Sequence, residues 1–238
     1  SRQALGAATG RTYVRHQRFN YRYDAPVRDL NHRLVVVPPH RHGSQHRRAH
    51  SVTVYAAGAR TTNRLDAAGN TLTRARVPVV PDRVEFVVNA VVERIGPDSA
   101  VALPAAALTD PRLLRPTRLT TADGAIRSSA LQLAGPDRLA AAERFCSYVH
   151  ETVRFRAGAT SVATTAAEVV AGGGGVCQDG AHVMIAMCRA VGLPARYVSG
   201  HLIGEGATHA WVEVIVADPA GGARAVAFDP SVGRRTGR

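Results

Sequence analysis

The sequence predicts an α+β protein in which a β-sandwich precedes a core of helices packed on an antiparallel sheet. Up to about Ile95, short runs rich in Val, Tyr and Thr alternate between apolar and polar residues, which is typical of strands. From Pro136 the apolar residues recur at helical spacing, and extended runs return after residue 195. With 238 residues, of which 45% are hydrophobic, the chain is long enough to bury a substantial core.

About six short strands are expected in the first part, among them residues 13–23, 33–37, 51–55, 71–77 and 84–95, with a turn at 66–70. Four prolines between positions 97 and 116 disfavour helical backbone at the residues before them, so residues 96–118 are predicted to be a connector. We therefore expect an N-terminal β-sandwich domain at residues 1–110 and a second domain at residues 111–238. A helix is expected at 136–150 and a shorter one at 166–171.

The net charge of +12 comes from arginine alone, since all 30 basic residues are Arg. Residues 1–130 hold 20 Arg and 9 acidic residues, whereas residues 131–238 hold 10 Arg and 9 acidic residues. Such a field can attract nucleic acid, an anionic surface or an acidic protein. A GC-rich genome would produce the same bias without a selected partner, and it is the simpler explanation. No basic motif interleaved with aromatic residues is present, so nucleic acid is not the expected partner.

The cysteines and histidines do not form a pattern typical of a disulfide framework or a metal site. Cys146, Cys177 and Cys188 are odd in number and contain no C-x-x-C pair. The histidine-rich segment 40–50 follows two prolines and is crowded with arginine, so we expect a solvated loop rather than metal ligands. We expect no metal and no cofactor.

Hydropathy and the first residues bear on the compartment. No apolar run is long enough to span a bilayer, so no membrane partner is expected. The residues after Ser1 lack the apolar segment of a secretory signal. The expected location is the cytoplasm.

The chemistry is expected around Cys177. Glycines at 172–175 precede it, and a helix is predicted after it from the spacing of Ala181, Met184, Cys188 and Val191. Unpaired N–H groups and the helix dipole at such a start favour a thiolate, and the glycines would permit close approach of a substrate. Cys188 and Cys146 lie on apolar helical stripes and are expected to be packing residues.

A thiolate that attacks an amide needs a base, and the base needs a group to orient it. His209 begins an extended run after a glycine-containing loop, and Asp229 ends the next run. If these runs are neighbouring strands, Asp229 can lie beside His209. The order of Cys, His and Asp on helix, strand and strand is that of papain-type enzymes.

Residues around this triad are expected to line or support the site. Asp179 falls in the first helical turn, where an acidic side chain caps free N–H groups, and we expect a structural role. Trp211 shares the face of His209 if the strand alternates, and Glu213 on that face would pair with Arg196 or Arg189. The flanking residues expected to bind substrate or support the triad are Gly175, Val176, Gln178, Asp179, His182 and Trp211.

Several motifs resemble the bacterial transglutaminase-like proteins: residues 175–179 (GVCQD), 181–182 (AH), 188–200 (CRAVGLPARYVSG), 209–214 (HAWVEV) and 228–230 (FDP), with weaker motifs at 19–27, 34–38 and 66–70. The resemblance implies the family's N-terminal β-domain followed by a transglutaminase-like, papain-like catalytic core. It also implies Cys177 as nucleophile, His209 as base and Asp229 as its orienting group. The sequence departs from the family at Gly180 and His201, where aromatic residues are usual, and near Ala225, where tryptophan is common.

These features predict a cysteine-dependent acyl-transfer enzyme that acts on peptide or glutamine amides through a thioester. We expect hydrolysis, as in a peptidase or amidase, in preference to transamidation, because the departures weaken the aromatic walls that an amine acceptor needs. The expected partner is a peptide or protein substrate. The alternative is a catalytically silent, Arg-rich binding protein for an acidic partner or nucleic acid. The sequence leaves the oligomeric state open.

Overall fold

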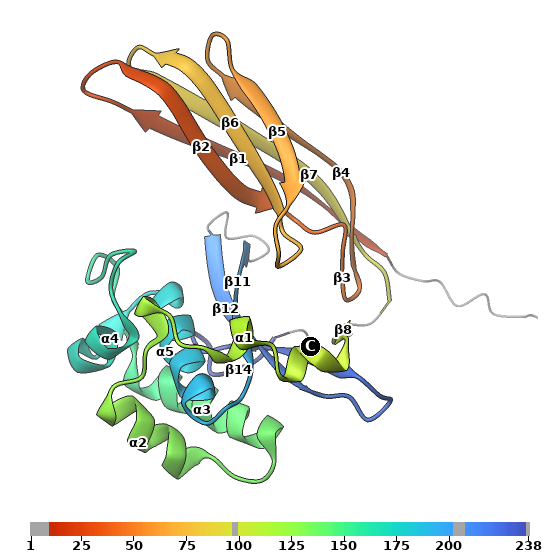
Figure 1. Cartoon of the computed structure of the whole chain (residues 1–238), viewed down its shortest axis with the longest axis vertical. Coiled ribbons are helices and arrows are strands. Elements are labelled where there is room, and N and C mark those ends of the chain that lie inside the picture. Colours follow the sequence, from red (N-terminus) through yellow and green to blue (C-terminus); the bar gives the residue numbers. More distant parts are fainter. Residues whose placement is uncertain (1–9, 97–99, 202–207, 237–238) are drawn as a thin grey trace, which may run out of the picture. The chain divides into compact units, whose positions relative to one another are not determined.

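The computed structural model describes residues 10–96, 100–201 and 208–236. The chain divides into two compact units, Ser1–Ser99 and Ala100–Arg238, and each is described by itself (Figure 1). The first consists of sheets, and the second packs helices on an antiparallel sheet, so the predicted α+β class is confirmed. Within the described ranges, no helix is long and apolar enough to cross a membrane.

The first unit is a sandwich of two antiparallel sheets with the strand orders β1-β7-β4-β3 and β2-β6-β5. Its strands are β1 (Arg11–Arg22), β2 (Val27–Val37), β3 (Arg41–His42), β4 (Gln45–Tyr55), β5 (Arg60–Leu65), β6 (Thr71–Val80) and β7 (Arg83–Arg94). The sheets enclose a core of Leu34, Ala75, Val77, Val80, Val84 and Phe86. Residues 10–96 contain strands and turns and no helix, as the alternating pattern predicted.

Two turns of the sandwich bear on the sequence predictions. The predicted turn at 66–70 is present, and the Asp66 carboxylate accepts hydrogen bonds from the N–H groups of Ala68 and Asn70, both at 2.8 Å. The prediction of a loop at 40–50 is wrong, because β3 and β4 form a hairpin there. Gly43, at a φ of 56°, makes the tight turn, and β4 is held by its ladder with β7.

The second unit contains the short segments β8 (Val101–Leu103), η1 (Ala105–Leu108), α1 (Pro111–Leu114), η2 (Arg118–Thr120), β9 (Arg154–Phe155) and β10 (Gly174–Gly175). Its longer helices are α2 (Gly124–Leu133), α3 (Arg138–Thr152), α4 (Ala166–Gly172) and α5 (Cys177–Ala190). The strands β11 (Ala195–His201), β12 (Thr208–Ala217), β13 (Ala223–Asp229) and β14 (Arg234–Arg235) form an antiparallel sheet in that order, and β8 also pairs with β13.

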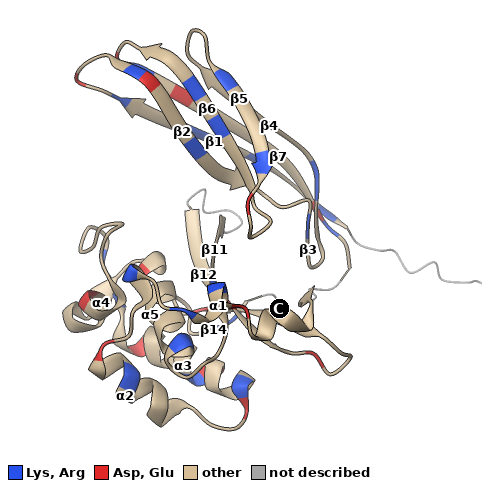
Figure 2. Ribbon diagram, viewed as in Figure 1, with Lys and Arg blue, Asp and Glu red and all other residues tan. Residues whose placement is uncertain are grey.

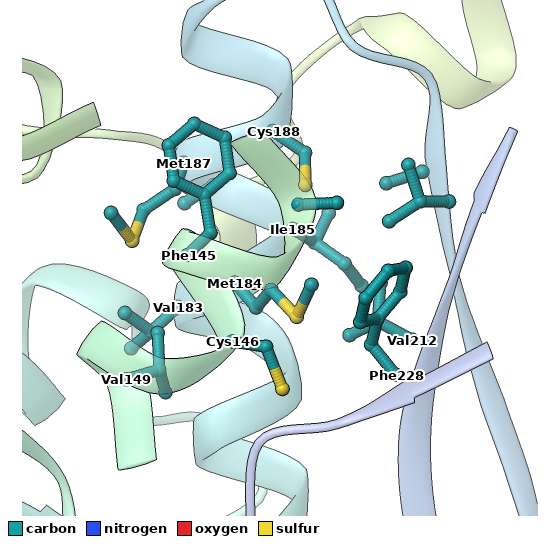
Figure 3. Packing of buried hydrophobic residues seen from close by; sticks show 14 of the residues in the cluster. Phe145, Cys146, Val149, Val183, Met184, Ile185, Met187, Cys188, Val212 and Phe228 are labelled. Carbon is teal, nitrogen blue, oxygen red and sulfur yellow. The ribbon is translucent and has the colours of Figure 1, made fainter. Parts of the chain in front are cut away.

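Helix α5 is the centre of this unit. Every residue from Asp179 to Cys188 is buried, because α2, α3, α4 and strand β12 all pack against the helix. Figure 3 shows α3 contributing Phe145 and Cys146 to this core, with Val212 and Phe228 reaching it from the sheet. The sequence predicted a single apolar stripe on α5. In the structure, the neighbouring helices and strand bury this helix on all sides.

Residues 100–118 are more structured than the connector predicted at 96–118, of which residues 97–99 lie outside the described residues. Pro111 occupies the first position of α1, where a missing N–H costs nothing, and Asp110 caps that helix through the Arg112 N–H at 2.9 Å. Strand β8 pairs with β13, so residues 100–110 are part of the second unit. That each unit is an independently folding domain stays a prediction.

Candidate active site

The start of α5 is built around a close contact between a glycine and a carboxylate. Strand β10 pairs in parallel with β9 and leads directly into α5, whose first residue, Cys177, is half-buried. A Cβ added at Gly175 would lie 2.6 Å from Asp179 Oδ2, so glycine is required there. The group that closely approaches the backbone of Gly175 is therefore the Asp179 side chain.

Asp179 fixes the turn that carries the thiol. Its Oδ2 accepts hydrogen bonds from the Val176 N–H at 2.7 Å and from the Thr160 hydroxyl at 2.6 Å. The side chain is fully buried, and its Oδ1 has no hydrogen-bond partner within the described part of the chain. Asp179 thus caps the helix, as its position indicated, and also ties the segment containing Thr160 to Cys177. Val176 and Gln178, on either side of Cys177, are half-buried.

The structure joins His209 and Asp229 into a hydrogen-bonded pair. Strands β12 and β13 are neighbours, with Val212 opposite Phe228. His209 Nε2 lies 2.6 Å from Asp229 Oδ2, and the two side chains are only 12% and 3% exposed. Asp229 Oδ1 accepts from the Ser231 N–H at 2.9 Å, which fixes the carboxylate. This arrangement leaves Nδ1 as the imidazole nitrogen available for a second partner.

The segment after β13 packs on the early part of α5. A Cβ at Gly180, three residues after Cys177, would lie 3.5 Å from Pro230 Cγ and 3.7 Å from Val149 Cγ1. There is room for a methyl group, whereas an aromatic side chain would displace Pro230 and with it Asp229. Glycine at position 180 therefore allows the close packing of Pro230 and Val149 on α5.

Trp211 and Glu213 share the face of His209, as alternation along the strand predicted. The rings of His209 and Trp211 are 6.3 Å apart and inclined by 26°. Trp211 lies so close over Gly200 that a Cβ there would overlap the indole. Glu213 is buried and forms an ion pair with Arg196 at 2.7 Å. Of the two partners predicted for Glu213, Arg196 and Arg189, the structure thus shows the pair with Arg196.

Tyr197 was not expected at the site. It lies on β11 opposite Val212, on the face that packs against α5, and its ring centroid is 5.4 Å from that of His182. Burial raises the pKa of Tyr197, and negative charge at Cys177 and Asp179 adds to this shift. The signal available in the sequence was the place of Tyr197 in the extended run that follows the helix expected after Cys177.

His182 is buried on α5, and its Nδ1 has no hydrogen-bond partner within the described residues. Burial lowers the pKa of His182, which favours the neutral imidazole. In the parts of the chain that the structure describes, no group of three or more His, Cys, Asp or Glu residues could hold a metal ion.

The fold of the second unit, a central helix that begins at a cysteine and packs on an antiparallel sheet bearing a His–Asp pair, is of the transglutaminase-like class. Residues 128–230 match the family model of the transglutaminase-like superfamily, and residues 13–93 match that of the bacterial transglutaminase-like N-terminal region. The chain therefore belongs to the bacterial transglutaminase-like proteins and carries both regions of that family.

Several known proteins are similar to this chain. Uncharacterized proteins of Mycobacterium tuberculosis and Mycobacterium bovis are 38% identical over 96 residues, which cover 36% of this chain and 31% of theirs. The match thus spans about a third of the length of these curated relatives. A candidate cysteine protease from Cytophaga hutchinsonii shares the fold, with a TM-score of 0.72 and 20% identity over 94% of this chain and 80% of that one. The periplasmic domain of TgpA from Pseudomonas aeruginosa aligns with a TM-score of 0.45 and 19% identity over 76% of this chain and 63% of that one.

Proposed function

We propose that this protein is a cysteine-dependent acyl-transfer enzyme of papain-like mechanism. The Cys177 sulfur attacks an amide carbonyl, and His209 takes the thiol proton at Nδ1. His209 then gives that proton to the departing nitrogen, so an amine or ammonia leaves and a thioester remains. The observation that carries the proposal is the buried His209–Asp229 hydrogen bond, on strands next to the helix that begins at Cys177.

Asp229 orients the imidazole and stabilises the imidazolium that forms in this cycle. The oxyanion of the tetrahedral intermediate would accept from the Cys177 N–H, because the N–H groups of a first helical turn have no partner within the helix. We propose the Tyr197 hydroxyl as the second donor, because Tyr197 lies on the face of β11 that packs against α5, the helix that begins at Cys177. Removing one such donor costs about 2.7–4 kcal/mol in other enzymes.

The proposed substrates are peptide or glutamine amides, and the favoured acceptor for the thioester is water. Water needs only access to the thioester, whereas an amine must be bound and oriented beside it. Gly180 faces Pro230, and Ala225 packs in a small aliphatic cluster with Ile215, so neither position supplies an aromatic wall for an amine. We further propose a cytoplasmic location, which the three unpaired thiols support.

The test is to incubate the full chain with a glutamine-containing peptide and excess amine, and to measure ammonia, free acid and amine adduct. We expect acid and ammonia in equal amounts, little adduct, and no product from Cys177→Ala. Cys146→Ala, which removes a thiol from the core, is the matched control and keeps the activity. Adduct exceeding acid at modest amine concentration would reverse the preference for hydrolysis. A lack of any product, with Cys177 intact, would favour the binding-protein alternative.

A further inference from the structure

One face of the sandwich carries a group of arginines that the acyl-transfer chemistry does not use. In β6, Ala75 and Val77 are buried in the sandwich core, so the intervening Arg74 and Arg76 lie on the outer face of the sheet β2-β6-β5. The pairing of β6 with β2 and β5 places three arginines of those strands on the same face. The arginine face comprises Arg33, Arg60, Arg64, Arg74 and Arg76, and Figure 2 shows it on β2, β5 and β6.

The register places like charges side by side on this face. Arg33 is directly opposite Arg74, and Arg60 is directly opposite Arg76. Directly opposite residues of an antiparallel pair have Cβ atoms about 4.5–5.5 Å apart, and like charges at that distance destabilise the pair. Arg74 is half-buried and the other four are exposed, so the guanidinium groups are accessible.

The described part of the chain offers these arginines little compensating charge. None of the five forms a salt bridge with a described acidic residue, although elsewhere in the same unit Arg18 pairs with Glu85 and Arg48 with Glu93. Asp66, just beyond the end of β5, is the acid within electrostatic reach of Arg64. A cluster arranged in this way gains stability from an external anion.

We propose that the arginine face binds an extended acidic segment of a protein. Alternate residues of an extended chain project on one side about 6.6–6.8 Å apart, which is the spacing of Arg74 and Arg76 along β6. Acidic side chains at every second position would therefore meet successive arginines, and each guanidinium can bind a carboxylate through two hydrogen bonds.

Two further features favour a peptide over nucleic acid. Strand β5 has a neighbour on one side only in the described sheet, and its six residues are all exposed. Its free backbone groups can pair with an extended peptide, which a nucleic acid cannot imitate. The residues on the described outer face between the arginines are Asn31, Thr62 and Leu72, none of which offers an aromatic ring for stacking on bases.

The test measures binding of the full-length protein to a fluorescent peptide of about 12 residues that alternates Glu and Ser. A Lys–Ser peptide and a short DNA duplex serve as comparison probes. The variant R60Q/R76Q removes one pair of facing arginines. The matched control R22Q/R83Q removes the directly opposite pair Arg22 and Arg83 from the other sheet, with the same loss of charge. Thermal unfolding of both variants checks that the sandwich is intact.

We expect the acidic peptide to bind, the affinity to fall with added salt, and the Lys–Ser peptide not to bind. R60Q/R76Q should weaken binding about tenfold, and R22Q/R83Q less than about threefold. Equal losses in both variants would show that net charge alone attracts the peptide, and would overturn the proposal. So would binding of the duplex in preference to the peptide with the same sensitivity to R60Q/R76Q, which would indicate a nucleic-acid site. Absence of binding by any probe at low salt would also overturn it.

Discussion

Burial separates the three thiols of this chain into two kinds. Cys146 and Cys188 have no exposed surface. Burial, with a smaller contribution from the Asp229 charge, raises the pKa of Cys146 to about 12, and burial also raises the pKa of Cys188. Cys177 is half-buried at the start of α5. Reaction with an electrophile requires a thiolate that the reagent can reach, so only Cys177 meets the steric requirement.

We therefore expect iodoacetamide near neutral pH to alkylate Cys177 alone in the folded protein, and all three cysteines in denaturant. Mass spectrometry of peptides after timed labelling measures this directly. Labelling of Cys188 at a rate equal to that of Cys177 would show that the nucleophile has been assigned wrongly.

The proposed role of Tyr197 predicts a kinetic signature. Tyr197→Phe removes the hydroxyl and keeps the ring that packs on His182, so kcat should fall by about 100-fold or more with little change in KM. Alkylation of Cys177 should keep its wild-type rate, because the thiol and its base are untouched. A parallel loss of alkylation and turnover would instead assign Tyr197 to positioning the thiol.

At the scale of elements, the half-buried Arg189 side chain attaches the proline-rich segment to the core. Arg189 donates to the Leu113 carbonyl at 3.1 Å, to the Thr120 hydroxyl at 2.8 Å and to the Ala195 carbonyl at 3.1 Å. It thereby joins α1 and η2 to α5 and β11. Burial lowers the pKa of Arg189, yet arginine remains charged at any physiological pH.

Arg189→Met should lower the free energy of unfolding by about 2–4 kcal/mol, because it leaves the carbonyls of Leu113 and Ala195 and the hydroxyl of Thr120 without this donor. The matched control is Arg144→Met at an exposed position of α3, where one hydrogen bond to the Leu133 carbonyl at 2.7 Å is lost and the expected cost is about 1 kcal/mol or less. Urea unfolding curves give both values. Equal costs for the two variants would contradict an anchoring role for Arg189.

At the scale of the molecule, β8 and the residues that follow it belong to the core of the second unit. Strand β8 pairs with β13, and Val101, Leu103, Ala107 and Leu108 pack against Ile215, Ala223 and Ala225. A second unit that lacks residues 100–110 would expose this cluster. The packing of β8 therefore sets where the chain can be cut if the two units fold independently.

We predict that a fragment of residues 100–238 unfolds cooperatively and keeps selective alkylation at Cys177. A fragment of residues 111–238 should be less stable by about 2 kcal/mol or more, because it loses β8 and the aliphatic side chains that follow. Thermal and urea unfolding of the two fragments make the comparison. Failure of the longer fragment to fold would show that the units depend on each other.

Local patterns in the sequence were sufficient for much of the fold. The change from alternating to helical spacing placed the sandwich before the helical core, and the glycine run placed Cys177 at the first residue of α5. Such signals depend on residues within one or two turns of each other, whose backbone preferences act over that range. The hairpin at 40–50 and helix α2 were not predicted, because contacts with distant parts of the chain stabilise them. The hairpin is held by the pairing of β4 with β7, and α2 by its packing against α5.

Contacts between distant residues required the tertiary structure. His209 and Asp229 are 20 positions apart, and only the register of β12 with β13 brings their side chains to 2.6 Å. The position of Tyr197 beside His182, and the alignment of Arg60 with Arg76, likewise depend on which strands are neighbours and in which register. A shift of one residue turns every side chain of a strand to the opposite face. Register is selected by the burial of a whole face at once, so no single segment of the sequence contains it.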